Sequence, residues 1–458
     1  MKENLKATGA LAPPESENPQ SAVTNLLERT QRGEIRQSIN NCVLILQNDP
    51  ALKGVVQKNL LTGRIDITRP VWWTRSGTCL TDTDMNYIKL YLEKTYEQRN
   101  HKAIEIALSV AANECAYHPV RDYLSALRWD GTSRMRHALH HFLGAPEDDL
   151  TEQSLRLFLL GAVSRVFEPG CKFEYMLCLV GGQGAGKSTF FRFLAIRDEW
   201  FTDDVKHLDD NRVYQRLGGH FIVEMSEMLA TANAKSVEEI KSFLSRQKDN
   251  YRTPYDKYPE DRPRQCVFGG TTNQQKFLPF DRTGSRRFVP VQVNPHQAEV
   301  HILEDEAASR AYIDQLWAEV MVVYRKGGFE LKFSDETEAQ LMEHRLAFMG
   351  EDTLAGQVQA WLDDYRGDYV CTLQIYQEAL GHVGETPRRW ETTEINDIMN
   401  LTIRGWKQTG QHRFIKYGQQ RSWTRVQPEK PKQEEFTDVT GSPDIPIFNA
   451  EQLSIDGY

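Results

Sequence analysis

The stretch Met176-Leu177-Cys178-Leu179-Val180-Gly181-Gly182-Gln183-Gly184-Ala185-Gly186-Lys187-Ser188 joins a short apolar run to a glycine-rich loop. Five apolar residues before glycine are typical of a buried strand in a parallel sheet, and the residues after the loop have a helical pattern. The loop has the spacing G-x-x-x-x-G-K-S, in which glycines let backbone N–H groups curl around phosphate oxygens. Because a strand precedes the loop and a helix follows it, a chance glycine turn is the weaker interpretation.

The loop predicts a binding site for ATP and Mg²⁺ at a helix N-terminus, where the helix dipole favours an anion. Lysine places a positive charge on the β- and γ-phosphates, and the serine hydroxyl is a ligand for Mg²⁺. Lys187 is therefore also a predicted catalytic residue, and Ser188 a predicted metal ligand. The predicted nucleotide-binding residues are Gly181, Gly182, Gln183, Gly184, Ala185, Gly186, Lys187, Ser188 and Thr189. The motif alone does not separate ATPases from GTPases or small-molecule kinases.

Three further apolar runs, near residues 221–223, 267–271 and 288–293, have the same strand character. Helical patterns lie between or after them, at residues 187–194, 210–217, 237–245 and 303–324. Strands that alternate with helices indicate a parallel sheet. We therefore expect an α/β P-loop ATPase core, in which helices flank a parallel sheet.

The rest of the chain divides around this core. Residues 81–116 and three shorter segments before residue 167 have helical patterns, whereas residues 352–426 combine short helices with a hairpin that has Gly410 near its turn. Helices followed by a small hairpin favour a winged-helix module. The predicted domains are a disordered arm (1–22), a mainly helical N-terminal domain (23–150), the P-loop ATPase domain (151–335), a winged-helix-like domain (350–427) and an acidic tail (428–458).

Two glutamates follow the apolar run at residues 221–223. An ATPase needs one acidic group in the Mg²⁺ shell and one that polarises the attacking water. We favour Glu224 as the metal ligand and Glu227 for water activation, although the spacing leaves the two roles interchangeable. The alternative is that both are ordinary charged residues at the surface.

Polar residues next to two further strands complete the set of candidate catalytic residues. Asn273 ends a strand, so its amide is predicted to sense the γ-phosphate or to position water; the alternative is a turn asparagine. Arg286 and Arg287 precede the last strand and predict an arginine finger supplied to a neighbouring subunit. The alternative is a salt-bridged surface pair, and the sequence does not say which arginine reaches phosphate.

The order of these motifs resembles the virulence-associated protein E family, which is similar to the superfamily 3 helicases of phages and mobile elements within the AAA+ ATPases. The resemblance covers residues 118–293 and rests on residues 118–124, 129–131, 168–172, 181–188, 222–227, 241–246, 251–255, 272–273 and 283–288. It implies an AAA+-like ATPase that assembles as a ring, usually a hexamer, with ATP bound between subunits. In that family pattern Glu224 or Glu227 serves the second ATPase motif, Asn273 is the sensor, and Arg286 or Arg287 is the finger.

Two basic stretches are candidates for nucleic-acid contacts. Lys241, Arg252 and Lys257 lie in the interval where superfamily 3 helicases have a pore hairpin, and tyrosines are interleaved with them. Residues 404–425 hold six Arg or Lys and no acid, with Arg413 and Lys416 near the middle. The alternatives are a solvated charged helix and loop for the first stretch, and an edge hairpin kept soluble by its cations for the second.

Composition restricts the function classes. The net charge of −9 excludes a generally basic nucleic-acid coat, so any contact with DNA must be local. Seven scattered cysteines without a C-x-x-C pair argue against a disulfide framework and a zinc ribbon. The first residues have no apolar signal segment, and no apolar run is long enough to span a membrane. We expect a cytoplasmic protein of a bacterial cell, encoded by a phage or prophage, with no membrane partner.

The leading hypothesis is an ATP-dependent DNA helicase or translocase that replicates phage or mobile-element DNA. Its expected partners are single-stranded or forked DNA, further copies of the chain in a homo-oligomer, and other replication proteins. The alternative is an initiator or regulator that binds replication-origin DNA, uses ATP as a switch and unwinds little. A small-molecule kinase is a third hypothesis and predicts a monomer. We expect no primase activity, because the N-terminal part has no clustered acidic metal-binding motif.

Overall fold

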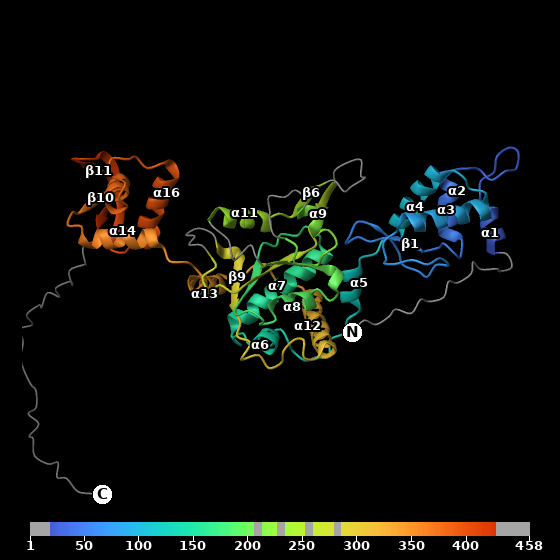
Figure 1. Ribbon diagram of the computed structural model, residues 1–458, viewed down its shortest axis with the longest axis horizontal. Helices are drawn as coiled ribbons and strands as arrows, with labels where there is room; N and C mark the ends of the chain where they lie inside the picture. Colours follow the sequence, from blue (N-terminus) through green and yellow to red (C-terminus); the bar gives the residue numbers. More distant parts are fainter. Residues whose placement is uncertain (1–18, 206–212, 227–233, 252–259, 279–284, 427–458) are drawn as a thin grey trace, which may run out of the picture. The chain divides into compact units, whose positions relative to one another are not determined.

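The computed structural model describes residues 19–205, 213–226, 234–251, 260–278 and 285–426. The chain forms two compact units, Met1–Glu351 and Asp352–Tyr458, each of which is described by itself (Figure 1). In the described part of the chain, no helix has both the length and the apolarity needed to cross a membrane. All seven cysteines are free thiols, as the scattered spacing predicts.

The first unit begins with four helices and a short hairpin that share one hydrophobic cluster. The predicted helical segment 81–116, whose apolar pattern has a break, forms two helices, and Glu97 ends the first in a left-handed conformation with φ of 58°. A capping box between Thr81 and Asp84 starts that helix. The elements are α1 (Pro19–Leu26), α2 (Ile39–Asn48), β1 (Val56–Lys58), β2 (Ile65–Ile67), α3 (Asp82–Tyr96) and α4 (His101–Glu114).

The centre of this unit is a five-stranded sheet with the strand order β4-β5-β8-β3-β9, in which every pair is parallel. Four of the strands lie where the apolar runs predict them, whereas β4 has only two residues and was not predicted. The strands are β3 (Met176–Val180), β4 (Phe201–Thr202), β5 (Ile222–Met225), β8 (Val267–Thr272) and β9 (Phe288–Gln292). The α/β architecture expected from the alternation is confirmed.

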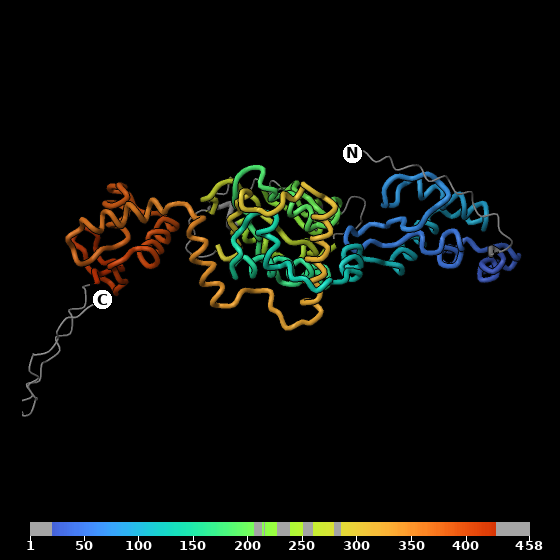
Figure 2. Tube along the Cα trace, turned by 90° about the horizontal axis from the view of Figure 1, so that it is seen from below, coloured from blue at the N-terminus to red at the C-terminus, as the bar shows by residue number. Residues whose placement is uncertain are grey.

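Both faces of the sheet are covered, which explains the uninterrupted apolar sequence of β3. Leu177 and Leu179 pack into one hydrophobic cluster, whereas Met176, Cys178 and Val180 pack into another on the opposite face. The elements around the sheet are α7 (Asp149–Phe167), α8 (Lys187–Leu194), η1 (Asp198–Trp200), α9 (Val213–Leu217), α11 (Ala234–Leu244), the pair β6 (Lys248–Tyr251) and β7 (Glu260–Pro263), η2 (Ser285–Arg287), α12 (Glu306–Lys326) and α13 (Asp335–Leu346). The chain can be followed by colour from α7 into the sheet and back to α12, which contacts α7 (Figure 2).

The predicted boundary at residue 150 differs from the packing. The helices α5 (Pro119–Ala126) and α6 (Ala138–Leu143) contribute Val120, Leu124 and Leu139 to the same cluster as the sheet. Residue 150 itself lies inside α7. Their helical patterns do not show against which core they pack, so the sequence alone places these helices in the N-terminal domain.

The second unit combines helices with a three-stranded antiparallel sheet of order β10-β12-β11. Its hairpin is longer than predicted, and Gly410 lies at a bulge within β11 instead of at the turn. The elements are α14 (Thr353–Asp364), β10 (Tyr369–Cys371), α15 (Thr372–Gln374) with its π-helical continuation η3 (Ile375–Ala379), α16 (Arg389–Asp397) with η4 (Ile398–Thr402), β11 (Trp406–Phe414) and β12 (Gly418–Arg425).

We predict that Gly269→Ala destabilises the first unit by about 1–3 kcal/mol, the usual cost of overpacking a core. A Cβ atom at Gly269 would lie 2.5 Å from ring atoms of Phe191, which is fully buried. Urea unfolding followed by tryptophan fluorescence measures the change. Gly350→Ala is the control, because a Cβ atom there meets nothing within 4 Å. Equal unfolding midpoints for the two variants would contradict the tight packing of β8 against α8.

Candidate functional site

The glycine-rich loop leaves the end of β3 and enters α8. Gly184 and Gly186 have φ angles of 79° and 78°, a region that glycine adopts without strain. The Lys187 ammonium folds back into the loop and donates hydrogen bonds of 2.7 Å to the carbonyl oxygens of Gly181 and Gly182. Burial lowers the pKa of Lys187. The cation is therefore held inside the loop by oxygen atoms, at the place where the motif predicts phosphate oxygens.

A buried carboxylate lies beside the loop. The Ser188 hydroxyl donates to Glu224 Oε1 over 2.7 Å, and the Thr271 hydroxyl donates to the same oxygen over 2.5 Å. Glu224 is only 1% exposed, and its second oxygen, Oε2, is buried without a hydrogen-bond partner among the described residues. Burial raises the pKa of Glu224, although both hydroxyls act in the opposite direction. The structure therefore brings Glu224 next to Ser188, and its role as a metal ligand stays a prediction.

Asn273 joins the same group from β8, the strand next to β3. Its side-chain oxygen accepts a hydrogen bond of 3.0 Å from the Lys187 ammonium. The backbone N–H of Gly181 donates to Thr272 O over 3.1 Å, which fixes the start of the loop against the end of β8. The turn interpretation of Asn273 is insufficient, because the side chain contacts the loop lysine.

Lys187, Ser188 and Asn273 line a cavity of about 510 Å³, and the buried Glu224 lies behind Ser188. Its lining includes residues that the sequence did not indicate, and of these only Thr271 has a signal, as a polar residue in an apolar strand. His301 and Leu303 follow β9 in an irregular segment, so nothing in the sequence relates them to the loop. The lining residues are Gln183, Gly184, Ala185, Gly186, Lys187, Ser188, Thr189, Ser226, Thr271, Thr272, Asn273, His301 and Leu303.

The chemistry of the cavity fits a nucleotide phosphate with Mg²⁺. Hydroxyl and carboxylate oxygens are ligands that Mg²⁺ prefers, and Glu224 Oε2 offers an unpaired lone pair beside the Ser188 hydroxyl. Lys187 and the N-terminus of α8 supply positive charge for phosphate. The residues of this site could therefore hold the metal ion and the anion together.

The two candidate finger arginines lie at the amino-terminal ends of the strands, whereas the glycine-rich loop lies at the carboxyl ends. They form η2 directly before β9, and Phe288 of β9 is level with Met176 at the start of β3. Both contact the carboxylate of Glu174, Arg286 over 3.1 Å and Arg287 over 3.3 Å. Arg287 also donates to Ser245 over 2.9 Å and its side chain is 20% exposed, whereas that of Arg286 is 59% exposed.

Part of the predicted site lies outside the described residues, namely Glu227, Arg252 and Lys257. Lys241 is only 4% exposed, because α11 packs this side of the helix into the core. An exposed cation that contacts a DNA strand was expected there, so the structure corrects the expectation for Lys241.

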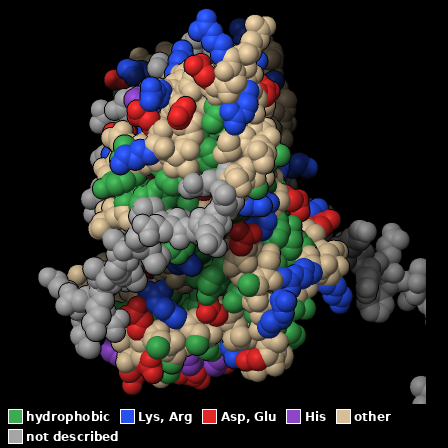
Figure 3. Space-filling model, turned by 90° about the vertical axis from the view of Figure 1, so that its right-hand side faces the viewer, with side chains coloured by type: hydrophobic (Ala, Val, Ile, Leu, Met, Phe, Trp, Pro, Cys, Tyr) green, Lys and Arg blue, Asp and Glu red, His purple; other side chains and the backbone are tan. Residues whose placement is uncertain are grey.

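The basic hairpin of the second unit keeps some of its cations exposed. Arg413 is exposed on β11. Lys416 contacts Glu378 over 3.5 Å, and Arg425 packs over the Trp406 ring at 4.9 Å while donating to backbone carbonyls. On the face drawn in Figure 3, basic and acidic side chains are interspersed. The whole sequence has similar numbers of both, 55 Lys and Arg and 64 Asp and Glu.

Fold and site define an α/β protein with a parallel sheet. A glycine-rich loop, a buried glutamate and an asparagine lie together toward the carboxyl ends of its strands. The family model of the virulence-associated protein E-like domain matches residues 124–349, so the chain carries a virulence-associated protein E-like domain. The predicted resemblance is confirmed.

Two solved structures of the NrS-1 C-terminal region, both A-form apo structures, are similar to the chain. One has a TM-score of 0.48 and 12% identity, covering 86% of this chain and 100% of that chain. The other has a TM-score of 0.45 and 12% identity, covering 81% and 96%. No curated protein matches the chain.

We predict that Glu224→Gln raises the melting temperature of the nucleotide-free protein near pH 8. A carboxyl whose pKa is raised by folding costs stability when ionised, and the cost disappears as the pH falls through the raised value. The advantage of the variant should therefore shrink on acidification. Thermal unfolding from pH 8 to pH 5 measures the effect.

Glu304→Gln is the matched control, because Glu304 is exposed near the same cavity. It should unfold like the parent protein at every pH. Addition of Mg²⁺ and ATP should stabilise the parent more than Glu224→Gln, since the variant lacks the carboxylate. A pH-independent loss of stability in Glu224→Gln would contradict this account of the buried charge.

Proposed function

We propose that the protein is an ATP-dependent DNA helicase or translocase of the superfamily 3 type, acting in replication of phage or mobile-element DNA. The observation that carries the proposal is the hydrogen bond between Ser188 and the buried Glu224, whose second oxygen has no partner in the described residues. Burying a carboxylate this way is unfavourable unless a cation completes the site. The virulence-associated protein E-like domain supports the replication context, through the family resemblance.

In this proposal each side chain of the cavity has one task. Lys187 exchanges its bonds to Gly181 and Gly182 for contacts to phosphate, and Ser188 with Glu224 holds Mg²⁺, which neutralises charge that develops on phosphate. Asn273, 3.0 Å from the lysine, is positioned to orient water or to sense the γ-phosphate. Glu227 is proposed as the residue that activates water.

We propose a ring assembly, and the separation between the arginines and the loop supports it. β3 and β9 are parallel and in register, so η2 and the glycine-rich loop are separated by at least the length of a five-residue strand, about 16 Å. In this proposal the arginine serves a phosphate bound to a neighbouring subunit, through a head-to-tail contact of the kind that closes rings. We propose Arg286 as the finger, because both arginines contact Glu174 but only Arg287 also donates to Ser245, and the side chain of Arg286 is more exposed.

We predict that Lys187→Ala and Arg286→Ala each lower kcat for ATP hydrolysis by about 100-fold or more, the usual loss for one charge-stabilising donor. Mixing the two variants should restore activity, because an Arg286→Ala subunit keeps its loop and a Lys187→Ala neighbour keeps its arginine. In an equal mixture, about a quarter of the head-to-tail contacts bring an intact Lys187 loop next to an intact Arg286. Phosphate release with single-stranded DNA present measures the recovery.

Two controls make the mixing experiment decisive. Lys187→Ala mixed with the double variant Lys187→Ala/Arg286→Ala should stay inactive. Arg287→Ala should lower the unfolding midpoint, because it removes contacts to Ser245 and Glu174 within the subunit. Absence of recovery from subunits that demonstrably co-assemble would reject the finger in trans and favour a monomeric kinase-type site.

A second function, an ATP-switched initiator that binds duplex DNA, is favoured by the hairpin of the second unit. The order α14, β10, α15, α16, β11, β12 is the helix and strand order expected of a winged helix. Arg413 and Arg421 lie on the same face of the hairpin, because Arg413 is opposite Gln419 and Arg421 is opposite Gln411. Two exposed cations on one face suit the phosphates of a duplex.

We predict that Arg413→Gln/Arg421→Gln weakens duplex binding and reduces the slope of log K against log salt by about 0.9 for each lost phosphate contact. Fluorescence anisotropy with a labelled duplex at several salt concentrations measures both changes. Arg366→Gln, an exposed arginine of the same unit outside the hairpin, is the control. An unchanged salt slope in the double variant would leave these cations with a solubility role only. Full unwinding with normal duplex binding would favour the helicase over the initiator.

A further inference from the structure

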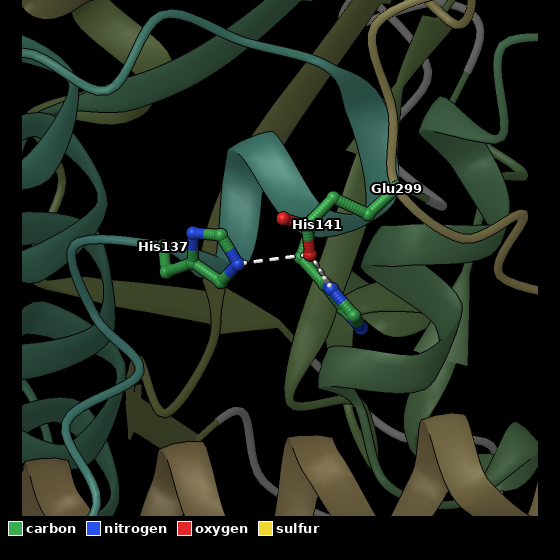
Figure 4. A group of neighbouring side chains, drawn as sticks. All are labelled: His137, His141 and Glu299. Atoms are coloured by element: carbon green, nitrogen blue, oxygen red, sulfur yellow. Dashed lines mark hydrogen bonds and ion pairs between the residues drawn. The ribbon is translucent and has the colours of Figure 1, made fainter.

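A group of two histidines and a glutamate lies outside the cavity of the glycine-rich loop. His137 Nε2 and His141 Nδ1 both contact Oε2 of Glu299, at 3.0 Å and 2.7 Å (Figure 4). One ligand atom from each residue lies within 4.8 Å of the others. Three side chains of metal-ligating type therefore converge on one point.

Local structure fixes all three side chains. His137 precedes α6 and His141 follows four residues later, so the two imidazoles lie on the same side of one helical turn. The His141 ring stacks on Tyr312 of α12, with centroids 4.7 Å apart and planes 9° apart. The backbone N–H groups of Glu299 and Val300 both donate to His141 O over 3.1 Å. The carboxylate is thus brought to the histidines by main-chain contacts as well.

A second carboxylate orients the outer histidine. Glu147 contacts His137 Nδ1, the ring nitrogen that does not face Glu299. Histidines that ligate metals commonly donate their other ring N–H to a carboxylate, which fixes the tautomer and strengthens the ligand. This outer partner would be unnecessary for a simple pair between His137 and Glu299.

We propose that His137, His141 and Glu299 bind one divalent transition-metal ion, Zn²⁺ by preference, with a solvent molecule in the remaining position. Two imidazoles and one carboxylate suit Zn²⁺, whereas Mg²⁺ prefers an all-oxygen shell. Tetrahedral bonds of about 2.0–2.1 Å place ligand atoms about 3.4 Å apart. The nitrogens of the two histidines need to move less than about 1 Å from Glu299 Oε2 to meet that geometry.

The ion ties α6 to the segment that follows β9. Asn294 N donates to Leu143 O over 2.9 Å, so this segment already runs along the end of α6. Farther along it, His301 and Leu303 line the cavity of the glycine-rich loop. Metal binding therefore stabilises one wall of that cavity. The site consists of residues outside the ATP-binding motif, so it does not depend on the proposed ATPase activity.

The test is calorimetric titration of ZnCl₂ into the full chain after chelator treatment and buffer exchange, with excess Mg²⁺ to occupy Ser188 and Glu224. One Zn²⁺ per chain with a micromolar or tighter Kd is expected. His141→Ala and Glu299→Gln should lose this site, and Glu147→Gln should bind about 10–100-fold more weakly. Circular dichroism before titration establishes that each variant is folded.

His296→Ala is the matched control, because His296 is an exposed histidine in the same segment as Glu299. It should bind zinc like the parent protein, and so should Lys187→Ala, which separates this site from the predicted nucleotide site. Substitution with Co²⁺ should give visible absorption that disappears in His141→Ala. The proposal is overturned if the parent chain binds no zinc under these conditions, or if folded His141→Ala and Glu299→Gln bind it as tightly as the parent.

Discussion

The register of β3 between β8 and β9 is the constraint on which the rest of the first unit depends. Val180 is level with Thr272 on one side and with Gln292 on the other. The glycine-rich loop therefore leaves the sheet where β8 delivers Asn273, and Glu224, which lies within β5 opposite Gly269 of β8, reaches Ser188 with its side chain. The same register puts Arg286 at the amino-terminal ends of the strands. One set of parallel backbone bonds thus decides which charges meet within a subunit and which do not.

Burying the charges of Glu224 and Lys187 lowers the stability of the ligand-free fold. Glu224 and Lys187 are both almost completely buried. Burial raises the pKa of Glu224 and lowers the pKa of Lys187, so it favours the neutral form of each. Loop carbonyls and the Asn273 amide stabilise the lysine, but Glu224 Oε2 has no partner among the described residues. Native proteins leave few buried polar atoms unpaired, and a bound ion is one explanation for such an atom. The cost therefore supports a site that is complete only with phosphate and metal.

The sequence was sufficient wherever a short motif carries its own geometry. Apolar runs ending in glycine or polar residues predicted four of the five strands and pointed to Glu224, which the structure brings next to Ser188. It was insufficient where a contact depends on distant packing, as for Glu174, which binds both finger candidates, and for His301 in the cavity. Lys241 was misjudged for the same reason: its helix carries charge, but the core covers this side of it. Gly410 was placed in a turn because a bulge and a turn use the same residue.

Basic residues illustrate why charge alone predicts function poorly in this chain. Arg264 is buried and binds Asp249 through two hydrogen bonds of 2.7 Å and 2.9 Å, and Arg345 is buried and donates to the backbone of η2 and β9. These cations hold the fold, and Arg345 fixes the segment from which Arg286 projects. Arg286 differs from them, because more than half of its side chain remains exposed. Under the proposed ring, a finger needs a main chain fixed by the core and an exposed guanidinium that can exchange its contact with Glu174 for one with a neighbour. The exposure of Arg286, more than the number of arginines around it, is therefore what favours it as the finger.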